Sequence, residues 1–253
     1  MLFKKLFFYI KTFLTNTFLY FKNIKRLHKL HNIEKKEGIL LKINELGYKK
    51  VRSYKKYTWK ARNGIFSFTY LGLKDDHLLI IKVSNIFDFK VQNALSKINS
   101  FNFDFSPSFD YFNYKNLSFN ISSFISHYKF LDLKYVLRKK DVKKILLQLN
   151  NILDSFYKNK LVHCDFVCRN IIIEKKNFKV IAIDYDTVFY GQEDYRPLSW
   201  KYLCYKKDNK LIFDDAYSVI WSLNKLNNKH IFADEEYTKI KEKIGRYFYS
   251  TNL

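Results

Sequence analysis

The segment 165–184 constrains the fold more than any other part of the sequence. It contains two short apolar runs that are flanked by polar residues. The runs Ile171–Ile173 and Val180–Ile183 predict a pair of strands joined by a tight turn. Asp165 and Asn170 precede the first run, and Asp184 directly follows the second. Because the ends of paired strands lie side by side, these polar side chains are predicted to lie close together.

The three side chains suit one kind of chemistry. Phosphoryl transfer from ATP requires a carboxylate at the acceptor hydroxyl and oxygen ligands for the magnesium ions that accompany the phosphates. We expect the catalytic group at the acceptor to be Asp165, and we expect Asn170 and Asp184 to bind Mg²⁺ through their oxygen atoms. The pattern therefore predicts an enzyme, an ATP- and Mg-dependent phosphotransferase.

The spacing His163-x-Asp165-x4-Asn170 resembles the catalytic loop of the protein-kinase-like superfamily. Asp184 lies fourteen residues after Asn170, where this family places a metal-binding aspartate, and Asp186 replaces the glycine that usually follows. The resemblance implies that Asn170 belongs with Asp165 to the catalytic loop. It also implies an α+β, two-lobed fold, with a small antiparallel sheet lobe and a short, mostly helical C-lobe.

Three further matches occur in the family's order. Gly64 lies where the family has its glycine-rich loop, and Lys82, between Ile81 and Val83, resembles the strand lysine that grips phosphates. The resemblance implies that Gly64, Lys82 and Asp184 contact ATP. Asp215 resembles the aspartate that opens a buried helix and braces the catalytic loop, and an exposed helix N-cap is the alternative reading.

The periodicity of apolar residues predicts the elements that carry these motifs. A five-strand sheet is expected from Thr58–Ala61, Ile65–Leu73, His77–Val83, Ser108–Tyr114 and Leu117–Ser126, with one inserted helix over Asp88–Asn99. A long amphipathic helix is expected to begin near Asp141, and the chain beyond the 171–183 hairpin is predicted to be helical. The predicted domains are a basic amphipathic helical segment over 1–45, an N-lobe over 46–128 and a C-lobe over 129–253.

Two departures from the family pattern bear on whether the chain is an active kinase and on its class of acceptor. The segment 84–106 contains no Glu to pair with Lys82, so Gln92 or Asp88 is the candidate substitute and a pseudokinase is an open alternative. Only about thirty residues separate Asp184 from Asp215, and no A-P-E element follows Asp184. This spacing favours a compact kinase for a small molecule or glycan over a kinase with a full protein-substrate platform.

The charge of the chain bears on its partners. With 46 Lys and Arg against 24 Asp and Glu, the formal charge is +22, which attracts phosphate-rich partners, although compositional bias alone also explains it. The longest charge-free run near the N-terminus, Thr12–Phe21, is too short for the roughly twenty residues of a bilayer crossing. The basic, amphipathic pattern of the N-terminal segment instead predicts a helix that lies on an anionic membrane or packs on the domain.

Among compact kinases, the chain resembles bacterial lipopolysaccharide core heptose and Kdo kinases. That resemblance implies an anionic, lipid-linked glycan acceptor and a cytoplasmic protein, in peripheral contact with the inner face of the membrane. Three sparse cysteines agree with a reducing compartment. The alternatives are a Ser/Thr or tyrosine protein kinase, an aminoglycoside- or choline-type kinase, and a non-catalytic nucleic-acid-binding protein. The last leaves the ordered motifs unexplained, and no specific nucleic acid is expected.

Overall fold

The computed structural model describes most of the chain and divides it into two compact units. It describes residues 27–54, 60–62, 65–85, 89–126, 128–131, 138–191, 204–207, 210–226 and 228–246. The first unit lies within Met1–Phe87 and includes Asn113–Phe119, and the second lies within Asp88–Phe112 and Asn120–Leu253. The predicted N-terminal helical segment is described only from residue 27, and its first 26 residues lie outside the described part.

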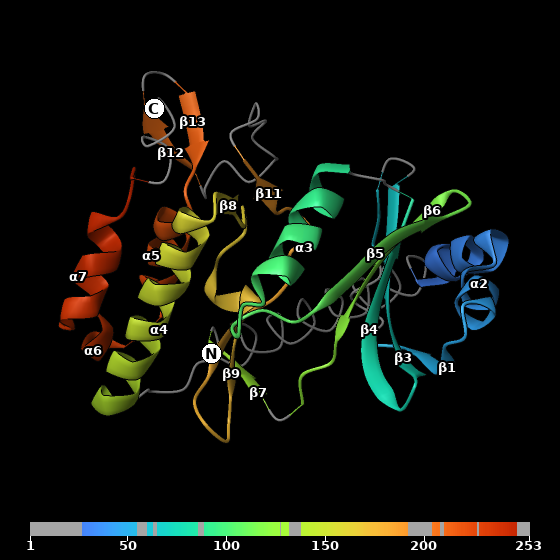
Figure 1. Ribbon diagram of the computed structural model, residues 1–253, viewed down its shortest axis with the longest axis horizontal. Coiled ribbons are helices and arrows are strands. Elements are labelled where there is room, and N and C mark those ends of the chain that lie inside the picture. Colours follow the sequence, from blue (N-terminus) through green and yellow to red (C-terminus); the bar gives the residue numbers. More distant parts are fainter. Residues whose placement is uncertain are drawn as a thin grey trace, which may run out of the picture. The chain divides into compact units, whose positions relative to one another are not determined.

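An antiparallel sheet is the main element of the first unit (Figure 1). Its strands are β1 (Lys49–Ser53), β2 (Lys60–Arg62), β3 (Ile65–Lys74), β4 (His77–Ser84), β5 (Phe109–Tyr114) and β6 (Leu117–Ser123), and parts of β5 and β6 belong to the second unit. Their order is β1-β3-β4-β6-β5, and β2 also pairs with β3. The prediction of five strands is thus corrected to six. We missed β1 because it is a largely exposed edge strand with three basic residues among five, so it has no apolar alternation.

The β3–β4 hairpin follows directly from its turn residues. Asp75 and Asp76 are the two residues between the strands, and both have a positive φ, of 48° and 60°. A two-residue loop of this kind matches the right-handed twist of the strands that it joins, and aspartate tolerates this backbone region better than most residues do. The register of the hairpin is therefore set locally, with Thr69 opposite Lys82 and Tyr70 opposite Ile81.

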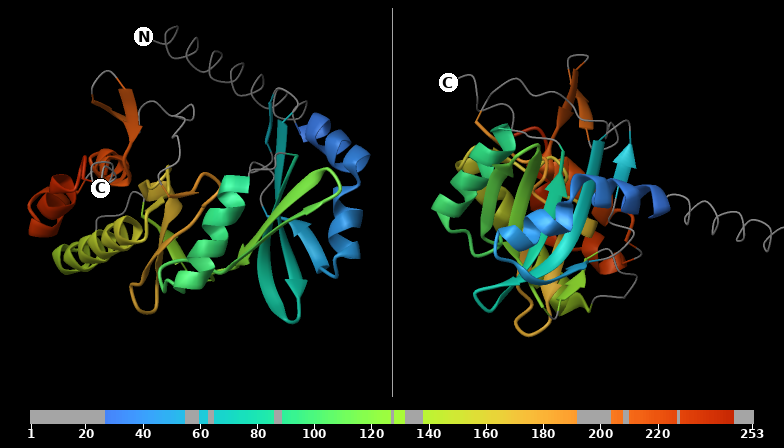
Figure 2. Two further views of the ribbon diagram at one scale, coloured as in Figure 1. Left: turned by 45° about the horizontal axis from the view of Figure 1, so that its top comes forward. Right: turned by 90° about the vertical axis from the view of Figure 1, so that its right-hand side faces the viewer.

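Helices cover one face of this sheet. Residues 27–37 are helical, and α2 (Ile39–Glu45) lies beside β1 (Figure 2). Glu34 is buried on this face and accepts a 2.8 Å hydrogen bond from the hydroxyl of Tyr70, whose pKa is raised by burial and by the Glu34 carboxylate. A buried carboxylate is tolerated only with such a partner, so this bond ties the helix to β3. No helix in the described residues is long and apolar enough to cross a membrane.

The second unit contains most of the helices and several short strands. The helices are α3 (Phe89–Phe101), α4 (Lys139–Lys158), α5 (Asp215–Leu223), α6 (Lys229–Phe232) and α7 (Glu235–Glu242). A three-stranded sheet has the order β10-β9-β7, from Val180–Ala182, Ile171–Glu174 and Tyr128–Phe130. β8 (Leu161–Val162) pairs with β11 (Phe189–Tyr190), and β12 (Cys204–Lys207) pairs with β13 (Lys210–Phe213). The predicted helical remainder is therefore wrong at β11, β12 and β13.

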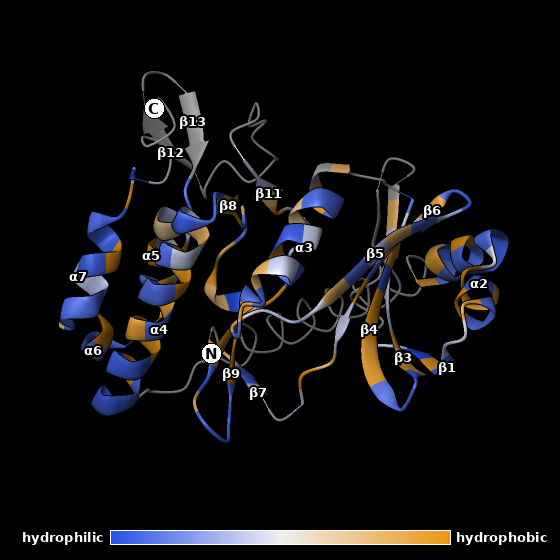
Figure 3. Ribbon diagram, in the orientation of Figure 1, coloured by the Kyte–Doolittle hydropathy of each residue, from blue (hydrophilic) through white to orange (hydrophobic). Residues whose placement is uncertain are grey.

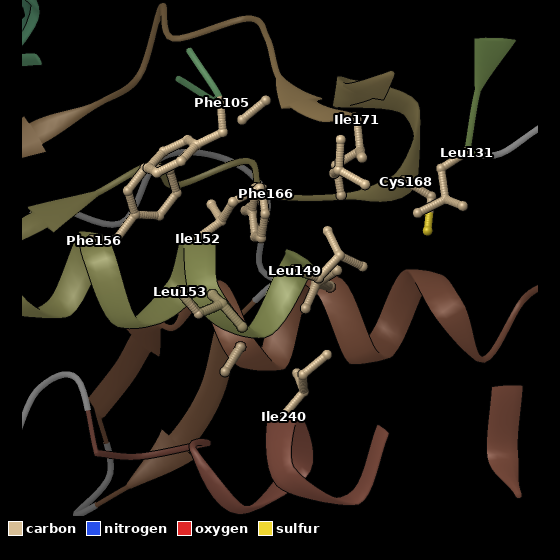
Figure 4. Packing of buried hydrophobic residues seen from close by; sticks show 14 of the residues in the cluster. Phe105, Leu131, Leu149, Ile152, Leu153, Phe156, Phe166, Cys168, Ile171 and Ile240 are labelled. Carbon is tan, nitrogen blue, oxygen red and sulfur yellow. The ribbon is translucent and has the colours of Figure 1, made fainter. Parts of the chain in front are cut away.

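Helix α4 organises the core of this unit, as its periodicity predicts. Its apolar positions recur at helical spacing and alternate with polar ones along the ribbon (Figure 3). The apolar residues at this spacing are all buried, namely Val142, Ile145, Leu146, Leu149, Ile152, Leu153 and Phe156. Figure 4 shows Phe156 beside Phe105 and Phe166, so the helix packs directly beneath the loop that carries Asp165.

Candidate active site

The predicted catalytic loop lies between β8 and β9, and the backbone brings its end beside the residue that precedes Asp184. β9 and β10 are antiparallel, with Ile171 opposite Ala182, as the sequence predicted. One step further along this ladder, the N–H of Ile183 donates to the carbonyl of Asn170 at 2.9 Å. Asn170 and Asp184 therefore extend from neighbouring points at the same end of the hairpin.

Asp165 is held by two donors from its own loop. The side-chain amide of Asn170 donates to the Asp165 carbonyl at 2.9 Å and to its carboxylate Oδ2 at 2.8 Å. Arg169 Nη2 donates to Oδ1 at 2.8 Å and to Oδ2 at 3.0 Å. Because the nitrogen of the Asn170 amide is occupied by Asp165, its oxygen is the atom that is suited to a cation. The predicted pair Asp165 and Asn170 is thus one hydrogen-bonded assembly.

Asp215 braces the backbone of the catalytic loop from a distant part of the chain. It is the first residue of α5, its side chain is buried, and its carboxylate accepts from the N–H of His163 at 2.7 Å and of Cys164 at 3.0 Å. Cys164 has a φ of 65°, a conformation that costs free energy for a residue with a β-carbon. The predicted brace is confirmed, and the N-cap alternative is wrong, because Asp214 caps α5 through the N–H of Tyr217.

A second residue of α5 holds the other end of the loop, and we did not predict it. Ser222 Oγ accepts from the N–H of Cys168 at 3.0 Å, within the short helical turn η2 (Cys168–Asn170). Asp215, Ser218 and Ser222 recur at helical spacing on an otherwise apolar helix, and all three are buried. A polar stripe on the buried face of a helix is the sequence signal that could have identified Ser222.

His163 links the catalytic loop to the Asp184 segment. Its ring is fully buried, and Nε2 lies 3.1 Å from the carbonyl oxygen of Ile183. Burial lowers the pKa of this histidine, so the ring is neutral and donates from Nε2 to that carbonyl. The hydroxyl of Thr187 donates to the His163 carbonyl at 3.1 Å, which adds a second link. Through these two contacts His163 acts as a structural brace between the loop and the Asp184 segment.

The segment from Asp184 to Asp186 has an unusual backbone and two anchors. Asp184 has a φ of 66°, and its side chain is exposed. Tyr185 is buried against Phe109 and His163, and burial raises the pKa of its hydroxyl. Asp186 accepts a 3.0 Å hydrogen bond from the side-chain amide of Asn120. Strained residues persist where neighbours hold them, and here the two residues after Asp184 supply that support.

Of the predicted ATP contacts, Lys82 belongs to the first unit and Asp184 to the second. Lys82 is half-buried on β4, opposite Thr69, on the sheet face opposite to that of its neighbour Ile81. Gly64 and Asp88 lie outside the described residues, and Gln92 is on α3 of the second unit. Contacts of Lys82 and Gly64 with ATP, and a replacement of the missing glutamate by Gln92 or Asp88, stay predictions.

The buried carboxyl of Asp215 is expected to make the stability of the fold depend on pH. Burial raises the pKa of its carboxyl from 3.8 to about 7, against the two backbone N–H groups that favour the charged form. Between these values the folded chain binds a proton that the unfolded chain has lost, so this contribution to stability falls as pH rises from about 4 to about 7. His163 acts in the opposite direction below 6.5, because burial lowers its pKa.

A variant isolates the contribution of Asp215. The free energy of unfolding in urea, measured near pH 5 and near pH 8, is expected to fall with pH more steeply in the wild type than in Asp215→Asn. An equal dependence in both proteins would contradict the shifted pKa.

No protein-family model and no curated protein matches the sequence. Among solved structures, the chain is similar to the Cydia pomonella granulovirus kinase PK-1, with 16% identity and a TM-score of 0.47, over 74% of this chain and 70% of that chain. The antiparallel sheet with Lys82, the braced loop of Asp165 and Asn170, and the β9–β10 hairpin that ends at Asp184 occur in the predicted order. The described residues form an α+β fold that carries these motifs in the order that the sequence predicts.

Proposed function

We propose that the protein is an ATP- and Mg-dependent phosphotransferase that acts on an alcohol group. The observation that carries the proposal is the assembly of Asp165 and Asn170 beside the start of the Asp184 segment. It presents a carboxylate, an amide oxygen and a second carboxylate at one end of a hairpin. These are the groups that phosphoryl transfer requires from a protein.

The residues fit a magnesium–nucleotide complex. Mg²⁺ is usually held in such sites by one or two carboxylates together with phosphate oxygens and water, so a cage of protein ligands is not needed. Asn170 and Asp184 are the candidate ligands, and no cluster of three or more His, Cys, Asp or Glu suited to a metal occurs within the described residues. When bound, the ion would neutralise negative charge on the phosphates.

In the proposed reaction, the acceptor hydroxyl donates a hydrogen bond to the Asp165 carboxylate. The acceptor oxygen forms a bond to the γ-phosphorus of ATP, while the bond from that phosphorus to the bridging oxygen of ADP breaks. The hydroxyl proton passes to Asp165, and the bridging oxygen leaves with the bonding electron pair. Asn170 and Arg169 hold the carboxylate in position for this transfer.

For the acceptor we propose a sugar hydroxyl of a lipid-linked glycan, such as heptose or Kdo of a lipopolysaccharide core, reached at the inner face of the cytoplasmic membrane. The proposal is supported by the resemblance of the motifs, by the short interval between Asp184 and Asp215, and by a formal charge of +22, which favours an anionic acceptor at an anionic surface.

A transfer assay with γ-labelled ATP and Mg²⁺ tests both the proposed kinase activity and the proposed acceptor. The acceptors are dephosphorylated lipopolysaccharide core, a generic protein substrate and an aminoglycoside, and Asp184→Ala provides the background. We expect label on the glycolipid that is absent from the variant. Label only on protein, or only on the aminoglycoside, would support the proposed kinase activity and reject the lipid-linked glycan as its acceptor. The absence of both transfer and ATP hydrolysis above the variant's background would reject the kinase and favour a pseudokinase.

A further inference from the structure

We propose that Arg169 determines acceptor specificity, by binding a carboxylate or phosphate group that the acceptor carries near its reacting hydroxyl. This inference rests on the proposed function and adds a requirement to it, that the acceptor is a sugar bearing an anionic group. By sequence, Arg169 is compatible with a phosphate contact or with an ordinary surface residue. Its position beside Asp165 is the observation that favours a contact with an anionic group.

The guanidinium lies at the part of Asp165 where an acceptor would arrive. Oδ2 of Asp165 accepts from both Asn170 and Arg169, whereas among the described residues Oδ1 accepts from Arg169 alone. Oδ1 therefore has more remaining capacity for the acceptor hydroxyl. A hydroxyl bound at Oδ1 would lie beside the Arg169 guanidinium, so other substituents of the same sugar would be within its reach.

Arg169 projects from a rigid part of the loop. Its neighbours Cys168 and Asn170 are buried, at 2% and 5% exposure, and they are held by bonds to Ser222 Oγ at 3.0 Å and to the carbonyl of Val167 at 2.8 Å. The Arg169 side chain itself is 44% exposed, while that of Asp165 is 14% exposed. The backbone at Arg169 is therefore held in place, while its guanidinium can be reached by a solute from the solvent.

The charge of Arg169 selects among the acceptor classes. An anionic sugar that approached Asp165 alone would be repelled by the carboxylate and by the phosphates of ATP, and the guanidinium beside Asp165 offsets this repulsion. A cationic acceptor, such as an aminoglycoside, would instead be repelled by Arg169. The planar guanidinium suits the paired oxygens of a carboxylate or phosphate better than an ammonium group does.

Matched acceptors and variants test the inference. The acceptors are Kdo and its methyl ester, and a heptose monophosphate and the neutral heptose, so that each pair differs in one anionic group. The variants are Arg169→Gln, which removes the charge, and Arg169→Lys, which keeps the charge but loses the planar guanidinium. Arg138→Gln is the control, because Arg138 forms a similar pair with Asp141 at the start of α4, in which the arginine is exposed and the aspartate is buried. The kcat and KM of transfer are measured for each acceptor, with thermal unfolding as a folding check.

We expect the wild type and Arg138→Gln to prefer an anionic acceptor, and Arg169→Gln to reduce that preference about 10- to 100-fold, mainly through the KM of the acceptor, with Arg169→Lys intermediate. The pair that shows the effect identifies the anion as carboxylate or phosphate. Transfer without a preference, or an equal loss for charged and neutral acceptors in Arg169→Gln, would overturn the inference. So would ATP hydrolysis without transfer to either anionic sugar. None of these three results contradicts the proposed kinase activity, which is rejected only if hydrolysis and transfer are both absent.

Discussion

Replacement of Asp165 by Asn is expected to lower phosphoryl transfer by about 10²- to 10⁴-fold, the range typical for loss of a general base. The amide cannot take the proton of the acceptor hydroxyl. It also presents an N–H₂ group where Arg169 and Asn170 both donate to the native carboxylate. The affinity for ATP should change little, because Asp165 is assigned to the acceptor.

Single-turnover transfer and equilibrium binding of a labelled ATP analogue separate these two effects. Asp184→Ala should lose both transfer and Mg-dependent nucleotide binding, since Asp184 is the proposed metal ligand. Asp104→Asn is the matched control, because Asp104 is an exposed aspartate of the same unit that pairs only loosely with Lys179, at 3.8 Å. Full transfer by Asp165→Asn would reject the assignment of Asp165, even if ATP still bound.

Replacement of Asp215 by Ala is expected to lower the free energy of unfolding by about 3 kcal/mol, because the backbone N–H groups of His163 and Cys164 would be left buried without an acceptor. Part of that cost is offset, since the native carboxylate is itself buried at a cost in solvation. Transfer should also fall, because Cys164 would lose the bond that holds its positive φ next to Asp165.

Urea unfolding measures the change in stability, and kcat at a temperature where both proteins are folded measures the change in activity. Asp234→Ala is a suitable control, because Asp234 also accepts a backbone N–H bond, from Glu236 at the start of α7. Loss of such an N-cap typically costs about 1 kcal/mol, and here we expect no change in kcat. An Asp215→Ala variant no less stable than Asp234→Ala would contradict the brace.

Local patterns in the sequence determined much of the fold and the outline of the site. The turn residues Asp75 and Asp76 set the β3–β4 hairpin, and the apolar spacing of α4 predicted its buried face. The short interval between Asn170 and Asp184 allows only a tight hairpin, so these two residues had to meet. In each case the cause acts between residues that are close along the chain, as backbone conformation, helical period or chain reach.

Local patterns failed where an element is short or exposed. β1 lies at an edge and buries too little apolar surface to show alternation. β12 and β13 were predicted as helix because each has only four residues and lacks a clear period of its own. Strands of this kind are defined by the partner with which they pair, and pairing between strands is not visible in the periodicity of either one.

Only the tertiary structure decided how the catalytic loop is held and what surrounds its carboxylate. The bond from Cys164 to Asp215 spans 51 residues and that from Cys168 to Ser222 spans 54, so no local period encodes them. Asn120 meets Asp186 across 66 residues for the same reason. Arg169 is only four residues from Asp165, yet η2 and its buried anchors determine that the two side chains meet. Polar groups in a packed interior must find partners, and the packing of distant segments determines which partners are within reach.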